Sequence, residues 1–239
     1  MTAWLDALLA VTLAPTCLVC GEPLERPMRG PVCERCWQTI TPLTPPLCDR
    51  CGDPLATWRP RETEYCPRCR RVPRAFDRAR AIGAYEGTLR EIIHALKYQA
   101  RRSVARSLGA LMRARGADLL AGATAAVPVP LHRSRLRARG FNQAADLARG
   151  LGLPVVAALR RQRATGDQIT LPAAQRHRNV RGAFCATRKA RQLRGAIVIL
   201  VDDVSTTGAT LDACARALKE AGVSEVRALT AARVRTLPR

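Results

Sequence analysis

The chain has 239 residues, a length that suits one domain of ordinary size and a smaller module. Hydrophobic residues make up 47% of it, which is typical of a globular protein and not of a disordered one. Forty Lys and Arg against 19 Asp and Glu give a net charge of +21, which predicts attraction to polyanions such as nucleic acid or phosphate-rich ligands. No stretch approaches the roughly 20 apolar residues of a transmembrane helix, so we expect no membrane span and a cytoplasmic protein.

The first 16 residues predict a short amphipathic helix. Trp4, Leu5, Leu8, Leu9 and Leu13 recur at helical spacing. The segment lacks the basic start of a signal peptide and is interrupted by an acidic residue, so we expect it to pack on its own protein.

Eight of the ten cysteines form four C-x-x-C pairs in the first seventy residues, and such pairs present two thiolates to one metal ion. The pairs are Cys17/Cys20, Cys33/Cys36, Cys48/Cys51 and Cys66/Cys69. Residues 17–24 are repeated at residues 48–55. Two consecutive zinc ribbons over residues 17–72, each closed by its own four cysteines, therefore fit best, with about two structural zinc ions. Cross-braced pairing of the first with the third pair is the open alternative. We expect the ribbons to have cores separate from the domain that follows.

From residue 78 to the C-terminus the chain alternates strand and helix patterns, which predicts a mostly parallel sheet flanked by helices in one domain, residues 78–239. Strands are predicted at 80–85, 125–129, 153–156, 197–201 and 225–234, helices at 87–99, 102–115, 142–149 and 211–221, and a basic loop before residue 142.

The most informative segment follows the aliphatic run at residues 197–201, which predicts a buried strand. Asp202 and Asp203 come at its carboxyl end, and then four hydroxyl residues and a glycine lead into a helix. Ligands of open α/β sheets sit beyond the carboxyl ends of strands, where a helix N-terminus offers N–H groups to an anion. The turn suits a phosphate, whereas the acidic pair suits vicinal hydroxyls. Together they predict a ribose phosphate site.

Residues 201–210 resemble the signature of type I phosphoribosyltransferases, the loop that binds 5-phosphoribosyl-1-pyrophosphate (PRPP). The resemblance implies that Asp202 and Asp203 hold the ribose hydroxyls and that Mg²⁺ accompanies the ligand. It implies that the 5-phosphate lies on the turn formed by Val204, Ser205, Thr206, Thr207, Gly208, Ala209 and Thr210.

Three further segments, with the cysteine pairs and this loop, resemble the ComF family (ComFC) and the related GntX proteins over essentially the whole chain. The segments are Tyr85-Glu86-Gly87 with residues 89–98, Val129-Pro130-Leu131-His132 running to Arg139-Gly140-Phe141-Asn142-Gln143, and Gln168 with Leu171, Arg176, Asn179-Val180 and Gly182-Ala183-Phe184. The implied fold is a type I phosphoribosyltransferase-like α/β domain, a Rossmann-like parallel sheet with flanking helices, preceded by a small double zinc ribbon.

By the same resemblance, residues 129–133 take the place of the family's pyrophosphate loop, and residues 163–184 that of the mobile loop over the site. The candidates for contacts there are Lys97, Leu131, His132, Arg133, Arg139, Asn142, Gln143, Gln168, Arg176 and Asn179. No general base emerges, and phosphoribosyl transfer needs chiefly Mg²⁺ and cations that neutralise the leaving pyrophosphate.

Two functions remain open on the sequence. The first is a PRPP-dependent pentosyltransferase, a glycosyltransferase whose acceptor the residues do not identify. The second is a non-catalytic PRPP-sensing protein that binds single-stranded DNA, because the resemblance implies a link to DNA uptake in natural transformation and to its machinery. The basic charge favours the second function, but only nine aromatic residues are available for base stacking.

Overall fold

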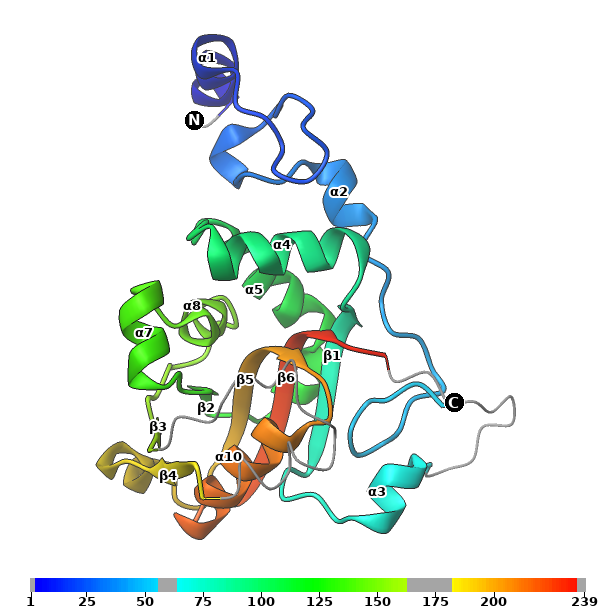
Figure 1. Cartoon of the computed structure of the whole chain (residues 1–239), viewed down its shortest axis with the longest axis vertical. Coiled ribbons are helices and arrows are strands. Elements are labelled where there is room, and N and C mark those ends of the chain that lie inside the picture. Colours follow the sequence, from blue (N-terminus) through cyan, green and yellow to red (C-terminus); the bar gives the residue numbers. More distant parts are fainter. Residues whose placement is uncertain (1–2, 56–63, 163–181, 236–239) are drawn as a thin grey trace.

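A computed structural model describes residues 3–55, 64–162 and 182–235, and it shows a parallel sheet with helices on both faces (Figure 1). The candidates Gln168, Arg176 and Asn179 lie outside the described residues. Among the helices of the described ranges, none has the length and apolar character needed to cross a bilayer.

The described elements follow the predicted alternation of strands and helices. The helices are α1 (Ala3–Leu13), α2 (Glu34–Gln38), α3 (Pro67–Arg71), α4 (Gly87–Tyr98), α5 (Val104–Arg115), α6 (Ala117–Leu120), α7 (Arg133–Arg139), α8 (Gln143–Arg149) and α10 (Ala209–Glu220), with 3-10 turns η1 (Pro27–Arg29) and η2 (Arg188–Leu193). The strands are β1 (Arg78–Ala84), β2 (Ala125–Pro128), β3 (Leu159–Arg161), β4 (Phe184–Ala186), β5 (Ile197–Ser205) and β6 (Glu225–Arg233).

The basic loop predicted before residue 142 is wrong. The basic loop before residue 142 contains the helix α7, which ends at Gly140 in the left-handed conformation, with φ of 77°. The helix buries none of its residues, and its leucine, Leu136, is 42% exposed. A helix without a buried apolar stripe has no periodic signal, so the sequence pattern missed it.

The main sheet has the order β1-β6-β5-β2, and all its pairs are parallel. Parallel strands bring their carboxyl ends to one edge, which here gathers the ends of all four. The strand predicted at 153–156 is reduced to a bridge between Val155 and Ala126 of β2. Strand β5 extends beyond its aliphatic run to Ser205, so the acidic pair belongs to the strand itself.

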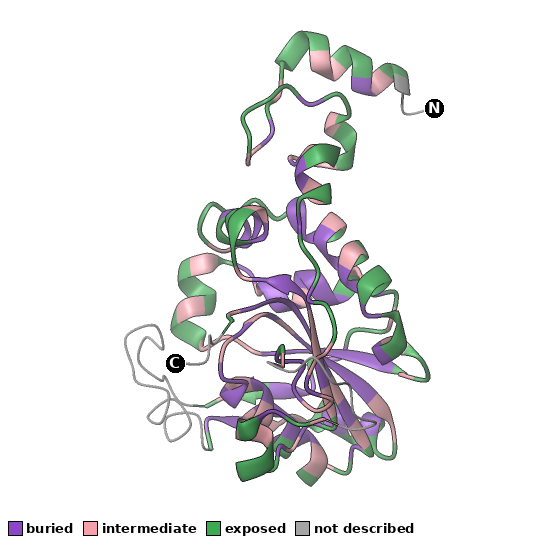
Figure 2. Cartoon of the chain, turned by 90° about the vertical axis from the view of Figure 1, so that its right-hand side faces the viewer, coloured by how far each residue is buried: buried purple, intermediate pink, exposed green. Residues whose placement is uncertain are grey.

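The sheet separates two hydrophobic layers, and Figure 2 shows its strands as largely buried. In β5, Val198 and Leu200 face the layer that contains residues of α10, whereas Ile199 and Val201 face the layer of α4, α5 and α8. This alternation is the period-two pattern of a strand that is buried on both faces.

The expectation that the ribbons have separate cores is wrong. Leu24 and Ile40 of the first ribbon join the layer of α4 and α5, and Cys48 and Cys66 of the second ribbon join the layer of α10. In Figure 1 the first ribbon lies above α4 and the second lies beside β1. Modules this small have little apolar interior of their own, so they bury apolar side chains against the sheet domain. The divisions at residues 1–16, 17–72 and 78–239 stay predictions.

The second ribbon is tied to the sheet by a buried ion pair. Arg233, at the end of β6, is 3% exposed, and its Nε lies 2.6 Å from Oδ1 of Asp53. Its Nη1 donates to the carbonyl of Cys51 at 3.0 Å. A Cβ at Gly52 would lie 2.7 Å from the carbonyl oxygen of Ala79 in β1, so only glycine permits this close approach.

Candidate functional site

The cysteines form two clusters, and within each cluster the four sulfur atoms lie within 4.8 Å of one another. One cluster holds Cys17, Cys20, Cys33 and Cys36, and the other holds Cys48, Cys51, Cys66 and Cys69. The predicted grouping into consecutive ribbons is therefore confirmed, and the cross-braced alternative is wrong. Four thiolates at this separation fit one tetrahedral zinc ion and leave no position for water, which is the donor set of a structural site.

The repeated sequence produces repeated geometry. The N–H of Cys33 donates to Sγ of Cys17 at 3.4 Å, and the N–H of Cys66 donates to Sγ of Cys48 at 3.3 Å. In both ribbons the later pair begins a short helix, α2 or α3, with its first cysteine at the N-cap. Backbone N–H groups aimed at sulfur stabilise the thiolate form that zinc requires.

The predicted phosphate turn joins β5 to α10. Strand β5 ends at Ser205, and Gly208 precedes α10 in the left-handed conformation, with φ of 75°, which glycine adopts without strain. The hydroxyl of Thr207 accepts a hydrogen bond from the N–H of Ala209 at 3.4 Å. The turn therefore presents the N-terminus of a twelve-residue helix at the carboxyl edge of the sheet, which is an arrangement that attracts an anion.

The two carboxylates beside the turn are not equivalent. Asp203 is 4% exposed, and its Oδ1 lies 2.8 Å from Nζ of Lys97, near the end of α4. The structure thus brings the predicted Lys97 to the acidic pair. Burial lowers the pKa of Lys97, but the attraction of Asp203 and Asp202 outweighs burial and leaves the pKa raised. Oδ2 of Asp203 and Oγ of Ser205 are buried without a hydrogen-bond partner among the described residues.

The pKa of Asp202 is raised toward neutral pH. Burial, followed by repulsion from Asp203, raises the pKa of Asp202 to about 7, although Lys97 and Arg161 act in the opposite direction. Arg161 lies on β3 and was not among the predicted site residues. Its strand has three residues, and nothing in the local sequence marks it as adjacent to the site.

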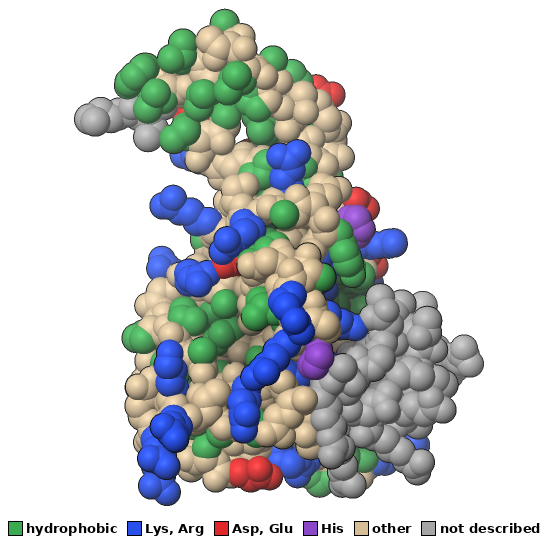
Figure 3. Space-filling model, turned by 60° about the vertical axis from the view of Figure 1, so that its left-hand side comes forward, with side chains coloured by type: hydrophobic (Ala, Val, Ile, Leu, Met, Phe, Trp, Pro, Cys, Tyr) green, Lys and Arg blue, Asp and Glu red, His purple; other side chains and the backbone are tan. Residues whose placement is uncertain are grey.

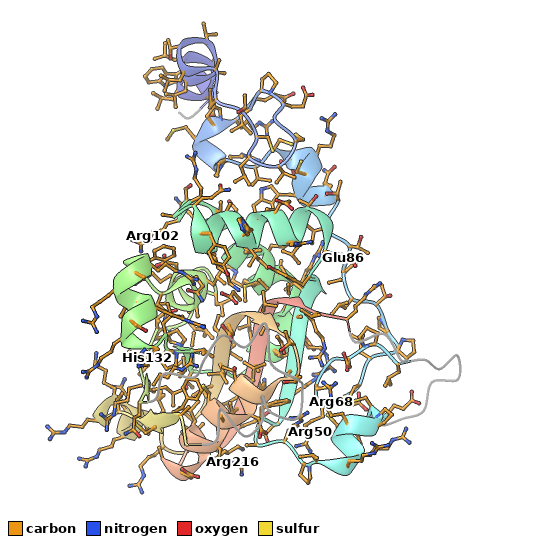
Figure 4. All side chains as sticks on the ribbon, viewed as in Figure 1. Arg50, Arg68, Glu86, Arg102, His132 and Arg216 are labelled. Carbon is orange, nitrogen blue, oxygen red and sulfur yellow. The ribbon has the colours of Figure 1, made fainter. Side chains whose placement is uncertain are left out.

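The predicted pyrophosphate loop follows β2 at the same edge of the sheet, where the N–H of Val129 donates to the carbonyl of Val201 at 2.9 Å. His132 is the N-cap of α7 and bonds to Ser134 through Nδ1, so its ring closes the start of this helix (Figure 4). Leu131 is half-buried before it, and Arg133 is exposed at the first position of the helix.

Three predicted candidates, at the end of α7 and the start of α8, form hydrogen bonds within the protein. Asn142 caps α8 through Oδ1 and donates from Nδ2 to the carbonyl of Val129 at 3.0 Å, so it ties the helix to the end of β2. Arg139 donates to Oε1 of the buried Gln143 at 2.6 Å, and its guanidinium lies 5.5 Å from the ring centre of Tyr98. The bond from Asn142 to Val129 holds the loop that follows β2, and the bond from Arg139 to Gln143 joins α7 to α8.

An antiparallel pair, β3 with β4, was not predicted from the sequence. It brackets residues 163–181, which lie outside the described part of the chain and include most of the predicted mobile loop. Three-residue strands carry too short an alternation to be distinguished from loops.

Two family models match the chain. A phosphoribosyl transferase domain matches residues 136–237, and a double zinc ribbon domain matches residues 8–70. Competence protein F of Haemophilus influenzae is 32% identical over 174 residues, covering 69% of this chain and 76% of that protein. DNA utilization protein YhgH of Escherichia coli K12 is 31% identical over 229 residues, covering 91% and 96%. A solved glutamine PRPP amidotransferase from B. subtilis is 23% identical with a TM-score of 0.34, covering 54% of this chain and 26% of that one.

Proposed function

This chain belongs to the ComF family of competence and DNA utilization proteins, and from that premise we propose that it binds PRPP with Mg²⁺ at the turn between β5 and α10. One observation carries the proposal. A carboxylate oxygen of Asp203 and the hydroxyl of Ser205 are buried without partners among the described residues, beside the N-terminus of α10. Buried polar atoms are costly unless they are bonded, so a ligand with both hydroxyl and phosphate groups suits them.

In this proposal Asp202 and Asp203 accept hydrogen bonds from the ribose hydroxyls, and residues 204–210 hold the 5-phosphate with backbone N–H and hydroxyl donors. Lys97 bonds to Oδ1 of Asp203 at 2.8 Å and offsets its charge, while Oδ2 of the same carboxylate is left to accept from the ligand. The oxygen-rich acidic pair fits a hard cation, and Mg²⁺ would neutralise charge on the pyrophosphate.

The pyrophosphate is assigned to the loop from Val129 to Arg133, because this loop leaves the sheet beside β5 at the same edge. As a leaving group it would be stabilised by Mg²⁺ and by the basic side chains of α7. Pyrophosphate release in the presence of candidate acceptors decides whether the site is a pentosyltransferase or a PRPP sensor.

Calorimetric titration with Mg·PRPP tests the binding proposal. Replacing both Asp202→Asn and Asp203→Asn removes the ribose acceptors, at ~1.5–3 kcal/mol for each charged hydrogen bond, so affinity should fall at least about tenfold. Asp118→Asn, a half-exposed carboxylate paired with Arg78, is the matched control and should bind as the wild type does. Equal affinity of the double variant and the control would overturn the proposal.

The second candidate function is binding of single-stranded DNA. It is favoured by the exposed helix α7, which carries Arg133, Arg135, Arg137 and Arg139 within seven residues. Figure 3 brings this side of the molecule forward and shows basic side chains spread over it with few acidic ones. The arginines of α7 can bind the phosphate groups of a DNA strand. Because α7 follows the proposed pyrophosphate loop, DNA bound there would compete with PRPP.

A further inference from the structure

The segment that leaves the second ribbon packs against the phosphate turn. The N–H of Ala75 donates to Oδ1 of Asp212 in the first turn of α10 at 2.7 Å. The ring of the buried Phe76 lies 3.8 Å from the position of a Cβ on Gly208. This segment therefore supports the turn and the start of α10 from within the protein.

The preceding residue, Arg74, brings a charge to the same place. It is 6% exposed, and its Nη2 donates to the carbonyl of Thr207 at 3.4 Å. Its Nε and Nη1 have no hydrogen-bond partner in the described part of the chain. Arg50 of the second ribbon, labelled in Figure 4, fixes the backbone here by donating to the carbonyls of Arg74 and Phe76 at 3.3 and 3.4 Å.

A guanidinium in this position is expensive for folding. A buried cation loses its hydration, and a carbonyl partner returns only part of that energy. The cost is recovered when an anion comes close, because attraction between charges is strong where water is excluded. Arg74 holds the Thr207 carbonyl in the turn that leads into α10, and a helix N-terminus such as this one attracts an anion.

We propose that Arg74 is a positioning residue for the 5-phosphate of the ligand. Its guanidinium holds the Thr207 carbonyl, and so the turn, and it adds a buried positive charge beside the bound phosphate. The second ribbon thus contributes to a site otherwise built from the sheet domain. This inference rests on the proposed binding of PRPP.

The test measures dissociation constants for ribose 5-phosphate and for Mg·pyrophosphate in the wild type, Arg74→Gln, Arg74→Lys and Arg194→Gln. The loss of one buried charge should weaken ribose 5-phosphate binding at least about tenfold in Arg74→Gln, whereas Arg74→Lys should retain most of the affinity. Pyrophosphate binding, assigned to the loop after β2, should stay within about twofold, because the charge removed is local to the turn. Arg194, exposed before β5 at the opposite edge of the sheet, supplies the control.

Thermal denaturation of the ligand-free proteins separates positioning from folding. Arg74→Gln removes a costly buried charge, so its melting temperature should equal or exceed that of the wild type. A variant that fails to fold, equal losses for both ligands, or unchanged binding of ribose 5-phosphate would each overturn the role of Arg74. If the wild type itself binds neither ribose 5-phosphate nor PRPP, the proposed function fails and this inference fails with it.

Discussion

The ammonium of Lys97 lies 2.8 Å from the carboxylate of Asp203, and this pair joins the end of α4 to the end of β5. Its side chains are 17% and 6% exposed, so the pair is largely shielded from water. Asp202, which precedes Asp203 on the strand, has a pKa raised to about 7 by burial and by Asp203, although Lys97 and Arg161 act in the opposite direction. Adjacent carboxylates of the same type thus have different electrostatic surroundings.

Lys97→Met should destabilise the protein, because it leaves Asp203 buried without its counter-ion. Breaking a buried pair costs roughly 3 kcal/mol. Lys219→Met is the matched control, because Lys219 pairs with Asp77 with side chains 31% and 40% exposed, and a surface pair contributes about 0–1 kcal/mol. Denaturant unfolding of both variants checks the difference. Equal losses of stability would show that the Lys97–Asp203 pair is no more important than a surface pair.

Asp202 should make the protein less stable as the pH rises from about 4 to about 7. Its pKa is raised from 3.8 to about 7 by folding, so within this window the folded state holds a proton that the unfolded state has released. Asp202→Asn has no carboxyl group to ionise, so its free energy of unfolding should exceed that of the wild type by roughly 4 kcal/mol at pH 8 and match it near pH 4. Unfolding measured across this range, with Asp118→Asn as control, checks the prediction. A wild type whose stability is flat over the window would contradict it.

The second zinc cluster should matter more for the stability of the whole chain than the first. Cys48 is fully buried, and its ribbon is held to β6 by the Arg233–Asp53 pair and to β1 by Arg80, which donates to the carbonyl of Cys48 at 3.2 Å. We expect Cys48→Ser to lower the melting temperature more than Cys17→Ser, because losing zinc from the second ribbon also loosens these strands.

Metal analysis beside the melting curves supplies the control for this comparison. The wild type should carry about two zinc ions per chain and each variant about one, since each cluster is closed by its own four cysteines. A smaller fall in melting temperature for Cys48→Ser than for Cys17→Ser would contradict the prediction. Loss of both ions in either variant would show that the two clusters do not bind zinc independently.

If single-stranded DNA is a partner, replacing Arg133, Arg135 and Arg137 of α7 with Ala should weaken its binding nearly equally for all sequences. The slope of log affinity against log salt should become shallower by about 2, at ~0.7 for each phosphate that an arginine no longer neutralises. The control removes the exposed Arg188, Arg191 and Arg194 at the opposite edge of the sheet. The same slope in both variants would place the DNA surface elsewhere. If saturating PRPP leaves the affinity for DNA unchanged, DNA and PRPP do not share a site.

The sequence revealed the parts of the site that are contiguous. The aliphatic run, the acidic pair and the hydroxyl-rich turn follow one another along β5 into α10, so one pattern predicts strand, site and helix together. The cysteine spacing and its repeat likewise predicted both clusters. Lys97 was recognised by resemblance, but its pairing with Asp203 depends on the packing of α4 against the sheet.

The residues that the sequence did not reveal act through tertiary proximity. Arg74 and Arg161 are two among 40 basic residues, and no local pattern distinguishes them from solvated arginines. Burial gives them their role, and burial at these positions is decided by the second ribbon and by the β3–β4 pair. The shared cores of the ribbons were missed for the same reason, because spacing defines metal ligands but not the surface on which a ribbon packs.

A crystal structure of the protein with Mg·PRPP tests the central claim most directly. We predict density for the 5-phosphate on the turn from Ser205 to Thr210, with the ribose hydroxyls on Asp202 and Asp203 and the pyrophosphate toward the loop after β2. Density for PRPP at any other place, or an empty turn at saturating ligand, would contradict it.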